Sequence, residues 1–292
     1  MIPLCINNEF GELKVAIVHD ASNIYDLSFE DWRKNVGDIQ LDNHPETGKI
    51  SRKYFIKQHQ NFLELLDHLG VQLIFPDTQD SSICQVYTRD PCFVIGNTLF
   101  VSSMRGSDRF SEIIGLKSIL NHVENIIHLE EEDVFIEGGD VFLLDHKDVV
   151  LVGIGQITNE KGFCKVKNNI LDIGIGKVEK IFHTALHIDC CLSPLPNGDA
   201  LYSVKHLSKD SLNILSKYFN KLIPLDAHEC EYFLSANMLW INREEVISNM
   251  SAKKTNAFLK YYGFKVHEMN FSQPVSMWGS FRCVTCPLQR DI

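Results

Sequence analysis

The segment CLSPLPNGDALYSVKHLSKDSLNILSKYFNKLIPL, residues 191–225, contains two short apolar runs, an amphipathic stretch and a third apolar run. The Asn-Gly-Asp sequence at 197–199 supplies the positive φ that a tight turn between the first two runs needs. Apolar residues recur at helical spacing over 212–219, and Ser208 stands where a helix N-cap is expected. The segment therefore predicts a β-hairpin, a helix over 208–220 and a closing strand over 221–225.

The same order recurs in three other parts of the chain. The further hairpin candidates are CFVIGNTLFVSS (92–103), DVFLLDHKDVVLVGI (140–154) and NMLWINREEVISN (237–249), with turns at 96–97, 145–148 and 242–244. They are followed by helix candidates at 108–123, 159–171 and 251–263, and by closing strand candidates at 125–129, 178–184 and 265–269. Units of roughly 50 residues that follow one another indicate a repeat architecture, although an ordinary α/β domain with coincident spacing is the alternative.

The N-terminal part resembles an incomplete or modified fifth unit. Strand candidates at 13–20 and 71–76 flank a helix candidate at 51–69, and a polar segment at 23–49 is interpreted as a loop or lid. The inward face of this helix is predicted to hold Phe55, Phe62, Leu65, Leu66 and Leu69, with Gly70 just past its end. Five such units would close into a ring. We therefore predict an α/β fold in one domain, residues 1–292.

Composition excludes several classes of protein. Hydrophobic residues make up 45% of the 292 residues and charged residues 23%, as in an ordinary globular protein. The net charge of −10, without a dense cluster of Lys and Arg, argues against a nucleic-acid partner. No apolar run reaches the ~18 residues of a membrane span, and the first residues lack the pattern of a signal peptide. Nine irregularly spaced cysteines indicate a reducing compartment, here the cytoplasm.

Polar residues collect at one point of the repeat, where a closing strand gives way to the next hairpin. Equivalent points of stacked units lie at one end of a fold, so these residues are expected to converge into a catalytic site. They are Tyr87, Arg89 and Asp90 in YTRDP, Glu137 and Asp140 in EGGD, His183, His187 and Asp189 in HTALHID, and Cys283 and Cys286 in WGSFRCVTCP.

Each of these motifs has a plainer interpretation. Arg89 and Asp90 could form a turn or an ion pair, and Glu-Gly-Gly-Asp could be a tight turn whose glycines satisfy backbone geometry. Cys283 and Cys286 form a CxxC that would suit a redox pair or half a zinc site, but no second CxxC follows. His183 and His187 would serve a metal only if the chain bent between them, so no metal is expected.

At these residues the chain resembles the guanidino-group-modifying enzymes, which include arginine deiminases, dimethylarginine dimethylaminohydrolases and amidinotransferases. The similar pieces follow the family's order over nearly the whole chain: NEFGELKVAIVH, YTRDPCFVIGNT, FIEGGDVFLL, VLVGIGQITNEKG, LHIDCCLSPL and GSFRCVTCPLQRD. The resemblance implies the pentein fold, a five-bladed α/β propeller of ββαβ units with pseudo-fivefold symmetry.

The resemblance also assigns roles. It implies Cys283 as the nucleophile, His187 as the general acid and base, and Glu137 as the third member of the triad. Asp90 and Asp189 would hold the guanidinium nitrogens, and Tyr87 would lie beside the guanidinium plane. Arg89 and Asp140 are further candidates for substrate binding.

These residue types suit guanidinium chemistry. Paired carboxylates match the N–H fork of the cation and hold its carbon near the thiolate. Thiolate attack and protonation of the departing amine by His187 leave an amidino-thioether on Cys283. Water or an acceptor amine then resolves the thioether, and no metal or organic cofactor is required. The competing thiol, Cys286, is interpreted as a buried structural cysteine.

Three functions remain open on the sequence. The first is a hydrolase of arginine or an N-substituted arginine, as Glu-Gly-Gly-Asp at 137–140 suggests. The second is an amidinotransferase, because the stretch 156–159, Gln-Ile-Thr-Asn, lacks the Arg with which deiminases bind the substrate carboxylate. Arg105 or Arg109 could bind that carboxylate instead or could form surface ion pairs. The third is an inactive binding protein. The expected partner is a small guanidino compound, and a homodimer is left open.

Overall fold

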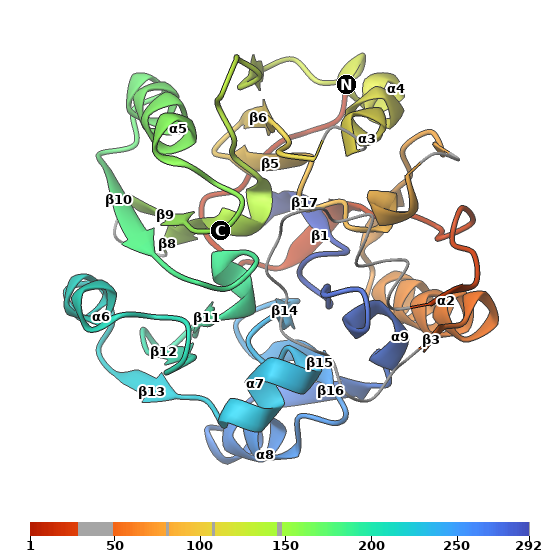
Figure 1. The fold of residues 1–292 in the computed structure, drawn as a ribbon, viewed down its shortest axis with the longest axis vertical. Coiled ribbons are helices and arrows are strands. Elements are labelled where there is room, and N and C mark those ends of the chain that lie inside the picture. Colours follow the sequence, from red (N-terminus) through yellow and green to blue (C-terminus); the bar gives the residue numbers. More distant parts are fainter. Residues whose placement is uncertain (29–48, 80–81, 107–108, 145–147, 292) are drawn as a thin grey trace.

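The computed structural model describes residues 1–28, 49–79, 82–106, 109–144 and 148–291. These residues form a mixed α/β fold with five three-stranded sheets, arranged around the middle of the molecule (Figure 1). The first sheet has the order β17 (Cys286–Arg290), β1 (Leu13–Ile17), β4 (Gln72–Ile74). The others are β5–β6–β7 (Cys92–Ile95, Thr98–Val101, Ile126–His128), β8–β9–β10 (Val141–Leu144, Val149–Ile154, Lys177–Phe182), β11–β12–β13 (Leu192–Pro194, Ala200–Tyr202, Leu222–Pro224) and β14–β15–β16 (Leu239–Trp240, Glu245–Asn249, Lys265–Met269).

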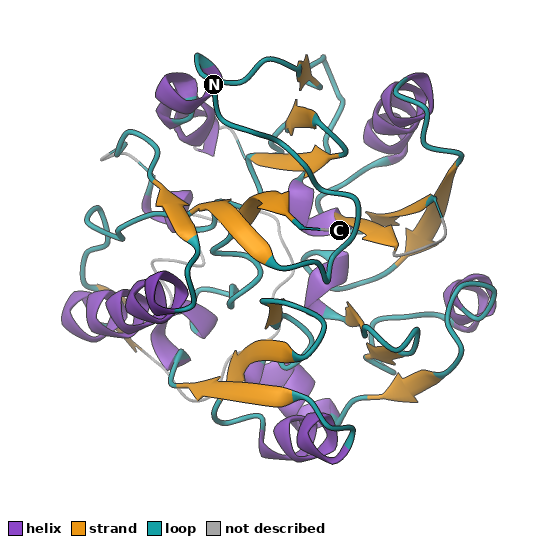
Figure 2. Ribbon diagram, turned by 180° about the vertical axis from the view of Figure 1, so that it is seen from behind, coloured by secondary structure: helices purple, strands orange, loops and turns teal. Residues whose placement is uncertain are grey.

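All five sheets share one connectivity. The middle strand pairs antiparallel with one neighbour and parallel with the other, and a helical segment connects the two parallel strands. These segments lie on the outside of the molecule, with the strands inside (Figure 2). They are α2 (Arg52–His68), α3 (Phe110–Gly115) with α4 (Lys117–Leu120), α5 (Glu160–Asp172), α6 (Lys209–Leu215) and α8 (Lys253–Tyr261).

The hairpins and caps expected from the sequence are confirmed where the structure describes them. Gly96 and Gly198 adopt φ values of 60° and 82° at the tips of their hairpins, which an L side chain rarely adopts. Ser208 caps α6 by accepting a hydrogen bond from the Ser211 N–H, and Asn159 caps α5 in the same way. The tip at 145–147 lies outside the described residues.

The N-terminal unit is complete, because the end of the chain supplies the strand that pairs antiparallel with its middle strand. β17 pairs antiparallel with β1, with Cys286 opposite Ile17, while β4 pairs parallel with β1 on the other side. Of the two alternatives expected for this unit, the incomplete unit was wrong and the modified unit is confirmed. The two paired strands are separated in sequence by nearly the whole length of the chain.

Two helix predictions needed correction. The single helix expected over 108–123 is broken into α3 and α4, because the Gly115 carbonyl accepts a hydrogen bond from the Asp77 N–H instead of continuing the helical ladder. The helix expected over 208–220 ends at Leu215, although Phe219 remains buried. Two short helices, α7 (Ala227–Phe233) and α9 (Ser272–Val275), were not anticipated.

Helix α2 packs against the segment that leads to Cys283. Phe55, Phe62 and Leu66 are fully buried on its inner face, as expected. The Phe62 ring lies 5.4 Å from that of Phe281, and Phe271 stacks on Phe281 at 4.3 Å. Aromatic pairs of this kind add about 0.5–1.5 kcal/mol each beyond area burial, so the Phe281 cluster fixes the backbone just before Cys283.

The segment interpreted as a loop or lid is described only at its ends. Residues Leu27–Ser28 (β2) and Lys49–Ile50 (β3) pair antiparallel, and 29–48 lie outside the described residues. Across the described parts of the chain, no helix combines the length and apolarity needed to cross a bilayer.

Candidate active site

A short polar segment stands immediately before the first strand of each sheet. Two of these segments are single 3₁₀ turns, η3 (Gly138–Asp140) and η4 (Ile188–Cys190). The polar residues that precede β5, β8, β11, β14 and β17 are, in that order, Asp90, Glu137 with Asp140, His187 with Asp189, Asn237, and Cys283. The structure therefore confirms that the candidate residues occupy equivalent positions of the repeat.

Hydrogen bonds join these five segments to one another in a closed circuit. Each bond connects one segment to the next, and the fifth returns to the first. The bonds are Gly138 N to Asp90 O (3.1 Å), Ile188 N to Asp140 Oδ1 (2.7 Å), Asn237 Nδ2 to Asp189 O (3.4 Å), Cys283 N to Asn237 Oδ1 (3.2 Å) and Arg89 N to Cys283 O (3.0 Å). Residues far apart in sequence are thereby held at fixed positions.

Asp90, Glu137 and His187 form one buried cluster. His187 Nε2 lies 3.1 Å from Glu137 Oε2, and His187 Nδ1 lies 3.7 Å from Asp90 Oδ1. A Cβ on Gly139 would come within 2.7 Å of the His187 ring. Gly139 is therefore required because the His187 ring leaves no space for a side chain, and not because of an unusual φ. The interpretation of Glu-Gly-Gly-Asp as a tight turn did not predict this contact.

An arginine of the chain itself already pairs with this cluster. Arg109 Nη1 donates to Asp90 Oδ2 (3.1 Å) and to Glu137 Oε2 (3.2 Å), while Nε and Nη2 bind the Glu112 carboxylate. Arg109 therefore forms ion pairs, as one of its two interpretations held, but its side chain is only 16% exposed, so these pairs lie mostly below the surface. Asp90 and Glu137 are thus spaced to hold a guanidinium between them.

The electrostatics of this cluster follow from burial and close charges. Burial raises the pKa of Asp90 to about 7, despite the opposing charges of His187 and Arg109. Burial acts against the charged form of His187, but the charge of Asp90 and the hydrogen bond to Glu137 outweigh it and raise its pKa well above the ordinary value. Burial disfavours ionised Glu137 as well, yet Arg109 and His187 hold its pKa below the usual range. The resting cluster therefore contains an imidazolium and an ionised Glu137 at neutral pH.

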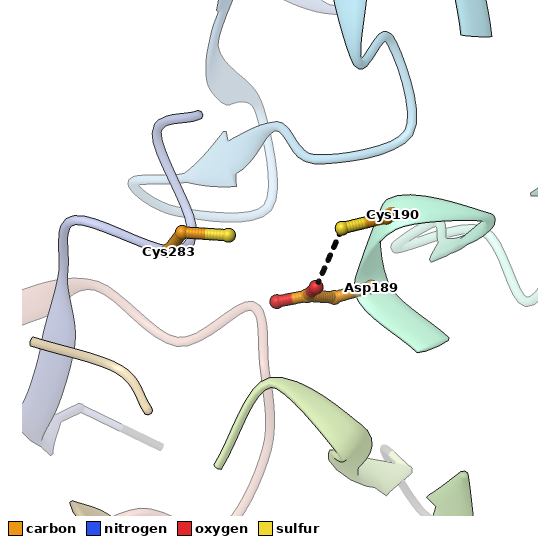
Figure 3. Close-up of side chains that lie close together, drawn as sticks. All are labelled: Asp189, Cys190 and Cys283. Atoms are coloured by element: carbon orange, nitrogen blue, oxygen red, sulfur yellow. Dashed lines mark hydrogen bonds between the residues drawn. The ribbon is translucent and has the colours of Figure 1, made fainter. Parts of the chain in front are cut away.

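Cys283 lies in a second buried cluster, together with Asp189 and Cys190 (Figure 3). The two sulfur atoms and a carboxylate oxygen of Asp189 all lie within 4.8 Å of one another. Asn237 Nδ2 donates to Cys283 Sγ at 3.1 Å, while its Oδ1 accepts from the backbone N–H of Cys283. Asn237 therefore orients both the thiol and the backbone that carries it.

The two cysteines of the CxxC do not pair with each other. Cys286 Sγ lies 3.7 Å from Cys92 Sγ, on the side of β17 that packs on β5, and is fully buried. All nine cysteines are free thiols. Cys286 is thus a buried thiol of the core, as expected, and Cys283 alone of the two lies in the polar cluster.

The remaining candidates surround these clusters. The Tyr87 hydroxyl donates to the Pro274 carbonyl at 2.9 Å, and burial followed by the charges of Cys84, Cys283 and Asp90 raises its pKa well above the ordinary value. Tyr87 therefore lies near both clusters.

Asp189, Asp140 and Arg89 have protein partners in the structure. Asp189 binds Arg282 Nη1 at 2.8 Å, and Asp140 binds His183 at 3.0 Å. Arg89 reaches Glu9 only at 3.5 Å. Asp140 and Arg89 belong to neither cluster, but each hydrogen-bonds a neighbouring segment, and their roles in substrate binding stay predictions.

Each cluster offers three groups of the kinds that ligate metals. Asp90, Glu137 and His187 are one such group, and Asp189, Cys190 and Cys283 are the other. In both groups an arginine guanidinium pairs with a carboxylate.

A cavity of about 610 Å³ reaches the second cluster. Cys190, Arg105, Lys205, His206, Glu231 and Trp278 are among its lining residues. The cavity gives Cys190, itself only 5% exposed, a route to solvent.

Asn237, Cys190 and Arg282 were missed by the sequence analysis. A signal existed for Asn237, because it precedes the fourth hairpin at the same point as Asp90, Glu137 and His187 precede theirs. Cys190 stands out in no motif of the sequence, and only the fold brings it to Cys283.

Comparison with known proteins identifies the family. The model of the family described as N,N dimethylarginine dimethylhydrolase, eukaryotic, matches residues 37–290. The chain belongs to this family. It is therefore a member of the guanidino-group-modifying enzymes, as the resemblance implied.

Relatives and solved structures agree with this assignment. An uncharacterised protein of Bacillus subtilis, YkgA, is 31% identical over 251 residues, which are 86% of each chain. The amidinotransferase SxtG of Microseira wollei superposes with a TM-score of 0.80 at 19% identity, covering 99% of this chain and 97% of that one. The dimethylarginine dimethylaminohydrolase of Pseudomonas aeruginosa superposes with a TM-score of 0.75 at 17% identity, covering 94% and 99%. The two structural likenesses show a shared fold.

Proposed function

We propose that this chain is a cysteine-dependent hydrolase of a guanidino compound, arginine or an N-substituted arginine, with Cys283 as nucleophile. The observation that carries the proposal is the Arg109 guanidinium held between Asp90 and Glu137 beside His187. The pair of carboxylates thus already accepts hydrogen bonds from one nitrogen of a guanidinium. Asp90 Oδ1 is a buried acceptor that no hydrogen bond satisfies among the described residues, so a donor from a substrate would satisfy it.

The fold proposal belongs with this function. We infer a single catalytic domain, residues 1–292, built as a five-bladed pentein propeller. Support comes from the five sheets of shared connectivity and from the closed circuit of hydrogen bonds between their entry segments. The circuit lets five distant segments contribute to one site.

The chemistry assigns one task to each group. Cys283 Sγ attacks the guanidinium carbon, and the negative carboxylates of Asp90 and Asp189 hold the cation in place. His187 Nε2 is bonded to Glu137, so Nδ1 is the ring nitrogen that gives a proton to the departing amine. Water then attacks the amidino-thioether carbon. His187 accepts one of the two water protons, the other passes to solvent, and Cys283 is released as the thiolate.

The roles of the other predicted residues follow the same proposal. Tyr87 lies beside the guanidinium plane, and Arg89 and Asp140 support substrate binding through the segments they brace. Asn237, which donates to Cys283 Sγ, positions the nucleophile. No step in this scheme needs a metal or an organic cofactor.

An amidinotransferase is the second candidate. The fold shared with SxtG and the Gln-Ile-Thr-Asn sequence at 156–159 favour it. In this reaction ornithine leaves first when arginine is the donor, and an amine instead of water resolves the amidino-thioether. The two functions thus share Cys283, His187 and Glu137 and differ in the second acceptor.

The two candidates are separated by their products. Incubation with arginine, and separately with N-methylated arginines, should give citrulline together with ammonia or the methylated amine, without an added amine. Ornithine that is released only when an amine acceptor is present would instead establish the transferase. If neither donor is consumed and no mass is added to Cys283, the inactive binding protein is the correct reading.

The affinity for the guanidinium should fall at acid pH. Asp90 has a pKa of about 7, so its carboxyl gains a proton as the pH falls through that value and loses the charge that attracts the cation. Because the pKa of His187 is raised well above its ordinary value, this residue stays protonated on both sides of pH 7. We expect the Kd of arginine for the Cys283→Ser variant to rise by up to about tenfold for each pH unit below the pKa.

Isothermal titration calorimetry on the Cys283→Ser variant, which cannot turn arginine over, measures this directly. The Asp90→Asn variant is the control, because it should bind weakly and equally at every pH. If the Kd of arginine for Asp90→Asn still rises as the pH falls below 7, the titrating group is not Asp90.

A further inference from the structure

Cys190 places a second thiol next to the proposed nucleophile. The Cys190 and Cys283 sulfur atoms lie within 4.8 Å, and their side chains point toward each other from different segments (Figure 3). A disulfide has an S–S length of about 2.05 Å, so the two sulfurs are close enough for side-chain rotation to bring them toward bonding distance. Nothing in the proposed hydrolysis uses the Cys190 thiol.

The surroundings of Cys190 suit thiol oxidation. The cavity of about 610 Å³ reaches Cys190, whose sulfur lies within 4.8 Å of Cys283 Sγ, so a small oxidant has access from solvent to this pair of thiols. Cys190 Sγ donates to Asp189 Oδ1 at 3.6 Å, which gives its proton a local acceptor. The hydrogen bond with Cys283 and burial both raise the pKa of Cys190 well above its ordinary value, so Cys190 rests as a neutral thiol.

We propose that Cys190 and Cys283 form a reversible disulfide on exposure to peroxide, which makes Cys190 a modification site that switches off and protects the nucleophile. The inference rests on the proposed function in so far as Cys283 is the attacking thiol. The class of reagent is hydrogen peroxide or an organic hydroperoxide.

The steps balance. The Cys283 sulfur attacks one peroxide oxygen, the O–O bond breaks, and a sulfenic acid and one water form. Cys190 Sγ then attacks the sulfenic sulfur while its proton passes to Asp189, and the departing hydroxide takes up that proton as a second water. Two thiols are oxidised by two electrons, and the peroxide is reduced to two waters. Dithiothreitol reverses the change by thiol–disulfide exchange.

The test uses the full-length protein treated with excess hydrogen peroxide. We expect a peptide that links Cys190 to Cys283 by mass spectrometry, with activity lost in parallel and regained with dithiothreitol. In Cys190→Ser the sulfenic acid has no partner thiol, so Cys283 should proceed to the sulfinic and sulfonic acids and the recovered activity should fall several-fold. A guanidino substrate that occupies Cys283 should slow formation of the link.

Cys230→Ser is the matched control. Cys230 lines the same cavity, and its thiol donates to the Cys190 carbonyl, so it is a competing partner. We expect this variant to form the Cys190–Cys283 link as the unmodified chain does. A Cys190–Cys230 link, or irreversible oxidation of Cys283 without any link, would overturn the proposal.

The readout separates this proposal from the proposed function. The linked peptide is detected by mass whether or not the reduced protein turns over a guanidino compound. If the reduced protein does not turn over a guanidino compound, this result counts against the hydrolase alone. If an active enzyme forms no Cys190–Cys283 link, this result counts against the disulfide alone.

Discussion

Replacement of Cys283 by serine is expected to lower kcat by at least about 10⁴-fold, the scale seen when one member of a nucleophile–base unit is removed. A hydroxyl is a far weaker nucleophile than a thiolate toward a resonance-stabilised guanidinium carbon. Steady-state release of citrulline or ornithine from the candidate substrates measures the loss. Full turnover in Cys283→Ser would remove the basis of the proposed mechanism.

The serine variant should retain the rest of the site. Asn237 Nδ2, which donates to Cys283 Sγ at 3.1 Å, can donate equally to a serine hydroxyl. The carboxylates that are proposed to hold the guanidinium are untouched. The Kd of arginine at neutral pH and the free energy of unfolding should therefore stay close to those of the unmodified chain.

Cys286→Ala is the matched control for the CxxC. Cys286 is fully buried against Cys92 and contributes no atom to either polar cluster. This variant should retain kcat and show its effect in stability alone, because it removes a buried sulfur from the core. A loss of kcat in Cys286→Ala equal to that in Cys283→Ser would exchange the roles of the two thiols.

The sequence predicts the repeat well because its signals are local. Hairpin turns such as that at Gly198 and the N-cap at Ser208 depend on a few neighbouring residues. The convergence of Asp90, Glu137 and His187 was also predictable, since equivalent points of a repeat lie at the same end of the fold.

Features that depend on contacts between distant segments were not predictable. β17 completes the N-terminal sheet by pairing with a strand from the start of the chain, and nothing in Cys-Pro-Leu-Gln-Arg indicates that partner. The break between α3 and α4 depends on a hydrogen bond from Asp77. The pairing of Arg109 with Asp90 and Glu137 likewise requires the folded backbone.

Asn237 could have been predicted from the sequence but was not. The repeat rule that selected Asp90, Glu137 and His187 applies to Asn237 as well, since it also precedes the first strand of its sheet. Its amide was passed over because Asn has no ionisable group. A rule based on position would have found it, whereas a rule based on reactive chemistry could not.

His187→Gln is expected to lower kcat by about 10²–10⁴-fold, the range associated with loss of a general acid–base group. Glutamine can keep a hydrogen bond to Glu137 but cannot give a proton to the departing amine. Amines leave as neutral molecules only after protonation, so this step should become limiting. Steady-state kinetics with an arginine-type substrate measures the loss.

The leaving group provides the decisive comparison. An isothiourea analogue of the substrate expels a thiolate, which leaves without prior protonation. If His187 acts as the acid, the defect of His187→Gln should be at least about tenfold smaller for the isothiourea than for the amine substrate, since each tenfold corresponds to about 1.4 kcal/mol of transition-state stabilisation. Equal defects for the two substrates would show that His187 only maintains the shape of the site.

His183→Gln is the control that distinguishes these roles. His183 is also buried and is hydrogen-bonded to a carboxylate, Asp140, but it is a member of neither cluster. Asp140 in turn accepts the N–H of Ile188, next to His187, so loss of His183 should disturb the position of His187 without removing its proton. We therefore expect His183→Gln to slow both substrates by the same factor, and a selective loss with the amine substrate to appear only in His187→Gln.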